Sequence, residues 1–132
     1  MKISVFAIIL TILGAFYSIC LLAIPAKFLS TYGITLDSAG IALARLYGAV
    51  LGGMAIIYGS SRNIPQSGRV WQNLLAGTLF FSVVSAVISA NSVLNGISNS
   101  MGWTTVAVQA LIALTSCYFL FQKKTAKSAG LA

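Results

Sequence analysis

The chain has 132 residues, of which 58% are hydrophobic and 7% are charged. Eight Lys and Arg residues against one acidic residue give a net charge of +7. So short and apolar a chain has no room for a soluble domain beside membrane-spanning helices, which indicates one membrane domain over residues 1–132. All of its basic residues except Arg45 flank apolar segments, where they set orientation and meet anionic lipid, so nucleic-acid binding is not indicated.

Four long apolar segments occupy most of the sequence. They cover residues 3–24, 39–59, 70–90 and 103–122. Each has about the 20 residues that an α-helix needs to cross a hydrocarbon core. The sequence therefore predicts an all-α polytopic membrane protein, built as an antiparallel four-helix transmembrane bundle.

The first segment, residues 3–24, is longer than the roughly 7–15 apolar residues of a signal peptide, and no A-x-A cleavage site follows it. Cys20 does not indicate lipoprotein cleavage, because Ile19 occupies the position that needs a small residue. We therefore expect an uncleaved span.

Residues 25–38, which connect the first two spans, carry the signals of a short helix. Pro25 suits a first helical position, and Gly33 can end the helix. One side of this helix carries Phe28, Leu29 and Tyr32. The pattern predicts a short interfacial helix on the outer surface of the membrane.

The second span follows Asp37, the only acidic residue, whose carboxylate can cap the free N–H groups of the first turn. Small residues then recur every four positions, a spacing that lets membrane helices approach closely. They are Gly40, Ala44, Gly48 and Gly52. Arg45 falls near this face, so we expect it to point toward the other helices and not toward lipid.

Each of the other spans also carries one stripe of small or weakly polar residues. The stripes are Ser4, Thr11, Gly14, Ala15 and Ser18; Thr78, Ser82, Ser85, Ser89 and Ser92; and Thr105, Gln109, Ala113 and Ser116. Helix packing alone accounts for such stripes. The alternative interpretation is that they line a narrow cavity.

The basic residues beside the spans predict the orientation. Six would lie on one side of the membrane: Lys2, Arg62, Arg69, Lys123, Lys124 and Lys127. Lys27 alone would lie on the other. Because basic residues concentrate on the cytoplasmic side, both termini are expected in the cytoplasm of a cell with this protein in its inner membrane.

One polar layer is the candidate ligand-binding site. Arg45 and Gln109 each lie six residues from the outer end of a span, a depth of about 9 Å. The full candidate set is Arg45, Gln109, Ser18, Ser85, Tyr17 and Asp37. In one interpretation these groups only satisfy a structural Arg45. In the other, its guanidinium anchors a carboxylate or phosphate head group with paired donors.

Motifs for catalysis are scarce. The chain has no His and a single acidic residue, so paired-carboxylate chemistry and His-rich metal sites are not expected. Cys20 and Cys117 belong to no C-x-x-C pair and differ by about 15 Å in predicted depth, which excludes a disulfide. We predict no enzyme activity, no catalytic residue, no metal and no cofactor.

The order of certain residues resembles a known family. Pro25, Gly33-Ile34 and Asp37 are followed by Ala44-Arg45-Leu46-Tyr47-Gly48 and then by Gly52 and Gly53. This order is similar to small four-span bacterial inner-membrane proteins of unknown function, broadly DoxX-like, and the likeness covers residues 25–62 best. It implies a four-helix bundle in a bacterial inner membrane and carries over no catalytic residue.

The functional hypothesis is a non-enzymatic integral membrane protein. Its partners would be the lipid bilayer and either a lipid-like or small amphipathic ligand or a membrane complex that it serves as accessory subunit. The alternative is a small transporter or channel assembled as an oligomer. A water-accessible path beyond Arg45 would favour the transporter, and a dead-end pocket open to lipid would favour the binding protein.

Overall fold

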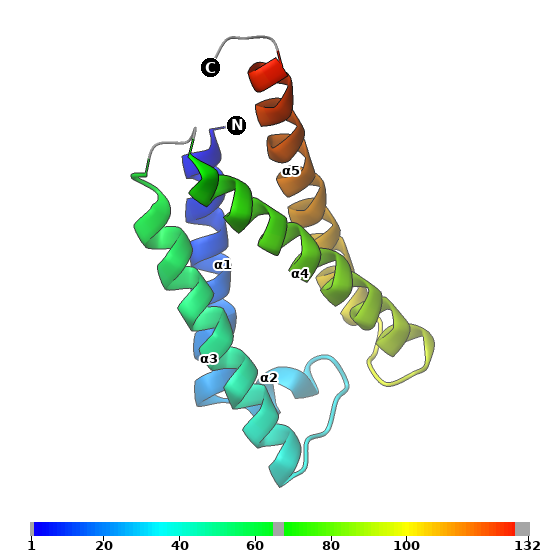
Figure 1. The fold of residues 1–132 in the computed structure, drawn as a ribbon. Helices are drawn as coiled ribbons and strands as arrows, with labels where there is room; N and C mark the ends of the chain where they lie inside the picture. Colours follow the sequence, from blue (N-terminus) through cyan, green and yellow to red (C-terminus); the bar gives the residue numbers. More distant parts are fainter. Residues whose placement is uncertain (1, 65–67, 129–132) are drawn as a thin grey trace. The chain divides into compact units, whose positions relative to one another are not determined.

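The structure, a computed structural model, describes residues 2–64 and 68–128, with the backbone alone for residues 123–128. All regular secondary structure in this part of the chain is helical (Figure 1). The helices are α1 (Ile3–Ala23), α2 (Pro25–Ser30), α3 (Ser38–Ser61), α4 (Arg69–Leu94) and α5 (Gly102–Ser128). The all-α prediction is confirmed.

Four of these helices are long and apolar enough to cross a membrane. The candidate spans are Ile3–Ala23, Ser38–Ser61, Arg69–Leu94 and Gly102–Gln122. They overlap the four predicted segments closely, since helical length and apolar composition are both readable from sequence. The chain therefore has the helices of a multi-pass integral membrane protein.

The helices fall into two compact units, Met1–Ile64 and Pro65–Ala132. In the first, α1 packs against α3, and α2 contacts both. In the second, α4 packs against α5. Each unit is thus a helical hairpin, and the association of all four spans into one domain of residues 1–132 stays a prediction.

Glycines set the register between α1 and α3. A Cβ atom added at Gly48 would lie 2.9 Å from the Cβ atom of Leu21, and one added at Gly14 would lie 3.2 Å from the Cβ atom of Ala55. The two residue numbers add to 69 in both pairs, as they do approximately at the other glycine contacts of this hairpin. The helices are therefore antiparallel, and the level of any residue on α3 can be read from its partner on α1.

Helix α2 folds back onto α1. It begins at Pro25 and is followed by Gly33, whose φ of 76° ends the turn as predicted. The ring of Phe28 lies 5.6 Å from the ring of Tyr17. Eleven residues of continuous helix would separate them by about 16 Å, so the chain turns sharply after α1, and α2 runs across the end of the hairpin (Figure 1).

The α4–α5 hairpin closes through a short connection. Gly96, with a φ of 70°, follows α4, and Gly102 begins α5 directly against the side chain of Val93. A side chain at Gly102 would collide with Val93, so glycine permits the two helix ends to meet. This contact places residues at equal distances from Val93 and Gly102 at the same level of the hairpin.

Candidate functional site

Arg45 is exposed on α3. The residues of α3 that are buried and face α1 lie at three- and four-residue steps and include Ala44, Gly48 and Ala55. Arg45 is one residue, about 100°, around the helix from Ala44. Arg45 therefore does not share the glycine face that packs on α1, and whether it points toward the helices of the other unit stays a prediction.

Arg45 is level with the end of α1. Gly48 lies opposite Leu21, so three residues back along α3 and three residues forward along α1 bring Arg45 opposite Ile24. Ile24 is the residue that ends α1 before Pro25 begins α2. The residues of α3 before Arg45 consequently extend past the end of α1.

Arg45 therefore lies at the end of the α1–α3 hairpin, and its depth in a membrane, predicted as about 9 Å, stays a prediction. The charge-free stretch of α3 runs from Arg45 to Arg62, the exposed residue that ends the helix. Its length, about 26 Å by helical rise, approaches the ~30 Å of a hydrocarbon core. Long basic side chains can extend the remaining distance toward the head groups, so the two arginines fit opposite boundaries of the membrane.

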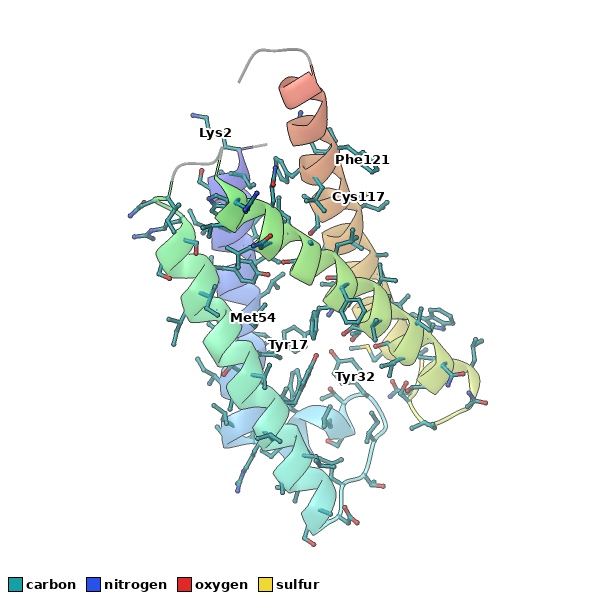
Figure 2. All side chains as sticks on the ribbon, in the orientation of Figure 1. Lys2, Tyr17, Tyr32, Met54, Cys117 and Phe121 are labelled. Atoms are coloured by element: carbon teal, nitrogen blue, oxygen red, sulfur yellow. The ribbon has the colours of Figure 1, made fainter. Side chains whose placement is uncertain are left out.

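Tyr17 belongs to an aromatic cluster with Phe16, Phe28 and Tyr32. Adjacent rings lie edge to face, with centroids 5.7 Å apart for Phe16–Tyr17 and 5.8 Å apart for Phe28–Tyr32. The hydroxyl oxygens of Tyr17 and Tyr32 are 3.5 Å apart, and Figure 2 shows these two residues side by side. The cluster fixes α2 and the turn after it against α1. Phe28 and Tyr32 were predicted to share one side of the short helix, but not to meet Tyr17.

Asp37 caps α3, as predicted. Its Oδ1 atom accepts a hydrogen bond of 2.7 Å from the backbone N–H of Gly40. It precedes Arg45 by eight residues, about 12 Å along the helix. Asp37 is the only acidic residue in the sequence, so no other Asp or Glu side chain of this chain can neutralise Arg45.

Ser18 is a packing residue of the α1–α3 contact. It is buried, and a Cβ atom added at Gly52 would lie 2.7 Å from its Oγ atom. Gly52 is seven residues from Arg45, about 10 Å along α3. Ser18 and Arg45 therefore lie at different levels, contrary to the predicted layer.

Gln109 and Ser85 belong to the second hairpin. Gly102 contacts Val93. Seven residues forward along α5 and seven residues back along α4 bring Gln109 level with Ala86, so Gln109 and Ser85 lie at nearly the same level. The Oε1 atom of Gln109 is buried without a hydrogen-bond partner among the described residues. Whether these two residues join Arg45 in one site stays a prediction.

Two serines of the same hairpin also carry buried oxygens without partners. Ser82 on α4 is 1% exposed and Ser116 on α5 is 0% exposed, and neither Oγ atom has a hydrogen-bond partner in the described part of the chain. By contrast, Thr78 and Thr115 donate to the carbonyl oxygens four residues earlier in their own helices, at 2.7 and 2.8 Å. The two serine hydroxyls have no such bond.

The described residues contain no group of three or more His, Cys, Asp or Glu side chains that could hold a metal ion. Cys20 and Cys117 are both free thiols and partly buried. Apart from the Asp37 carboxylate and these thiols, the polar side chains of the described residues are mostly basic groups, hydroxyls and amides. These groups suit binding by charge and hydrogen bonding.

No family model, curated protein or solved structure matches this chain. The class of the protein, a multi-pass integral membrane protein, rests on its four apolar helices. The DoxX-like resemblance of residues 25–62 stays an expectation.

Proposed function

We propose that this protein is a non-enzymatic integral membrane protein that binds a lipid-like ligand with an anionic head group at Arg45. The observation that carries the proposal is the exposure of Arg45 level with the end of α1, where the one acidic side chain of the sequence, Asp37, already caps α3. A guanidinium presents paired donors that match a carboxylate or a phosphate. The surrounding surface suits the rest of an amphiphile, because Leu43 and Leu46 are 67% and 65% exposed.

The proposed orientation places both termini in the cytoplasm of a bacterial cell, with the protein in the inner membrane. Six basic residues flank the spans on the cytoplasmic side in this arrangement, which follows the positive-inside tendency. Reporter fusions after Gly68 and after Lys127 should both be active only with a cytoplasmic reporter. Activity of an exported reporter at either position would reverse the orientation.

A small oligomeric transporter or channel is the second candidate. It is favoured by the buried oxygens of Gln109, Ser82 and Ser116, which have no partner among the described residues and could serve a polar path. Accessory binding to a membrane complex is the third. Accessory binding is supported by exposed apolar side chains such as Phe80, which is 72% exposed.

Native mass spectrometry of protein released in mild detergent tests the ligand-binding proposal. Wild-type protein should retain an amphiphile. Arg45→Met should lose the amphiphile while keeping its helicity and melting temperature. Arg45→Lys should retain part of it, because an ammonium group lacks the paired donors of a guanidinium. Arg62→Met is the matched control, because Arg62 is an exposed arginine at the other end of α3. Unchanged retention in Arg45→Met would refute the proposal.

Gln109→Leu tests whether Gln109 and Arg45 belong to the same ligand-binding site. If Gln109 contacts the same ligand, this variant should lose part of the mass that Arg45→Met loses. If it retains the full wild-type mass, Gln109 does not belong to the Arg45 site.

A further inference from the structure

A second cation, Lys27, lies at the same end of the α1–α3 hairpin as Arg45. Pro25, the first residue of α2, follows Ile24, the residue level with Arg45. Lys27 comes two residues later and is exposed. Helix α2 also contacts α3, the helix that carries Arg45. The fold therefore places two exposed basic residues, 18 positions apart in the sequence, at the same end of the hairpin.

The position of α2 is fixed by contacts around Lys27. The ring of Phe28 packs on Tyr17 at 5.6 Å and on Phe16 at 6.4 Å. The backbone carbonyl of Lys27 accepts a hydrogen bond of 2.8 Å from the Oγ atom of Ser30. Since Phe28 is held against α1, its neighbour Lys27, about 100° around the helix, is directed away from this packed face.

The charge at this end of the hairpin is not balanced. Lys27 and Arg45 are opposed by Asp37 alone, and one oxygen of Asp37 is already bonded to the backbone N–H of Gly40. Exposed apolar side chains lie beside the two cations, with Ile24 at 49% and Leu46 at 65% exposure. A molecule complementary to this surface carries an anionic group next to an apolar chain.

We infer that Lys27 and Arg45 together bind the phosphate of an anionic phospholipid. The inference rests on the proposed function and specifies its ligand class. A phosphate offers acceptor oxygens in several directions, so the paired donors of Arg45 and the point charge of Lys27 can approach it together. A carboxylate presents its acceptor oxygens in one plane, so a phosphate, with oxygens in several directions, suits two cations that approach from different helices better.

Competition among defined lipids tests this inference. Delipidated protein is mixed with phosphatidylglycerol, phosphatidylcholine and oleate at equal concentrations, and the bound lipids are counted by native mass spectrometry. Wild-type protein should prefer phosphatidylglycerol over both others. Lys27→Gln should lower that preference about fivefold, the effect of one basic residue near an anionic lipid, and Arg45→Gln should lower it further.

Two controls accompany the variants. Arg62→Gln removes an exposed cation from the opposite end of α3 and should leave the preference unchanged, whereas Lys27→Arg should preserve it. Inorganic phosphate added in excess should not displace the bound lipid, because the apolar contacts belong to the lipid alone. Helicity and melting temperature establish that each variant is folded.

The outcomes distinguish the inference from the proposed function. If Lys27→Gln binds as wild type while Arg45→Gln loses lipid, the two-cation site is wrong and the Arg45 site stands. Equal binding of oleate and phosphatidylglycerol, displacement by inorganic phosphate, or an equal loss in Arg62→Gln would each overturn the phospholipid assignment. If wild-type protein binds none of the three lipids and retains no other amphiphile, the proposed function fails as well.

Discussion

Gly48 lies directly against Leu21. A Cβ atom added at Gly48 would be 2.9 Å from the Cβ atom of Leu21 and 3.2 Å from the backbone oxygen of Ser18. A Cβ atom is bonded directly to the backbone, so it cannot rotate away from a neighbour as the end of a long side chain can. The approach of α3 to α1 therefore depends on the absence of a side chain at residue 48.

Gly53 provides a matched comparison, because a Cβ atom added there meets nothing within 4 Å. We expect Gly48→Ala to lower the free energy of unfolding by about 1–3 kcal/mol through overpacking. Gly53→Ala should be neutral or stabilise by up to about 1 kcal/mol through helix propensity. Unfolding of both variants in detergent, followed by circular dichroism, measures the difference. Equal stability of the two variants would contradict the register of the α1–α3 hairpin.

Phe28 is the ring between Tyr17 and Tyr32, and its removal should loosen α2. Aromatic contacts of this kind contribute about 0.5–1.5 kcal/mol each. Phe28→Ala should therefore speed hydrogen exchange at the amide of residue 28, which donates to the carbonyl of Ile24 at 2.9 Å, by about tenfold. Phe80→Ala, at an exposed ring of α4, is the control. Unchanged exchange in Phe28→Ala would mean that the aromatic cluster does not hold α2 in place.

Ser82 and Ser116 should tolerate loss of their hydroxyls. A buried hydroxyl without a partner carries a desolvation cost, so Ser82→Ala and Ser116→Ala are each expected to be neutral or to stabilise by about 1 kcal/mol. Thr78→Val is the contrasting variant, because it removes the 2.7 Å hydrogen bond to the carbonyl of Leu74 and should destabilise. Thermal unfolding in detergent compares the three. A clear loss of stability in either serine variant would indicate a bound water, ligand or helix that pairs with the hydroxyl.

Local sequence signals predicted much of the fold. Apolar length identified the four spans, Pro25 and Gly33 bounded the short helix, and Asp37 was expected to cap α3. Each of these features depends on residues within one or two helical turns. Such features can be read from a single sequence because the physical cause and the affected backbone are neighbours.

The level and face of Arg45 could not be predicted in this way. They depend on the register between α1 and α3, which non-local contacts such as Gly48 with Leu21 determine. Counting from the first apolar residue assumed that all of α3 lies at membrane depth, whereas its first residues extend past the end of α1. The contact of Tyr17 with Phe28 was missed for the same reason, since it requires the chain to turn sharply after Ile24.

Cysteine accessibility along α3 tests most directly whether Arg45 lies at the membrane boundary. Ala42→Cys, Arg45→Cys and Ala49→Cys would be made in a chain with Cys20→Ala and Cys117→Ala, since residues 42, 45 and 49 are all exposed on the hairpin. The variants are placed in vesicles and treated with a charged, membrane-impermeant maleimide during freeze–thaw, so that the reagent reaches both faces. The account predicts rapid labelling at residues 42 and 45 and protection at residue 49, about 6 Å deeper along the helix. Protection at residue 45 equal to that at residue 49 would place Arg45 within the hydrocarbon core and contradict the account.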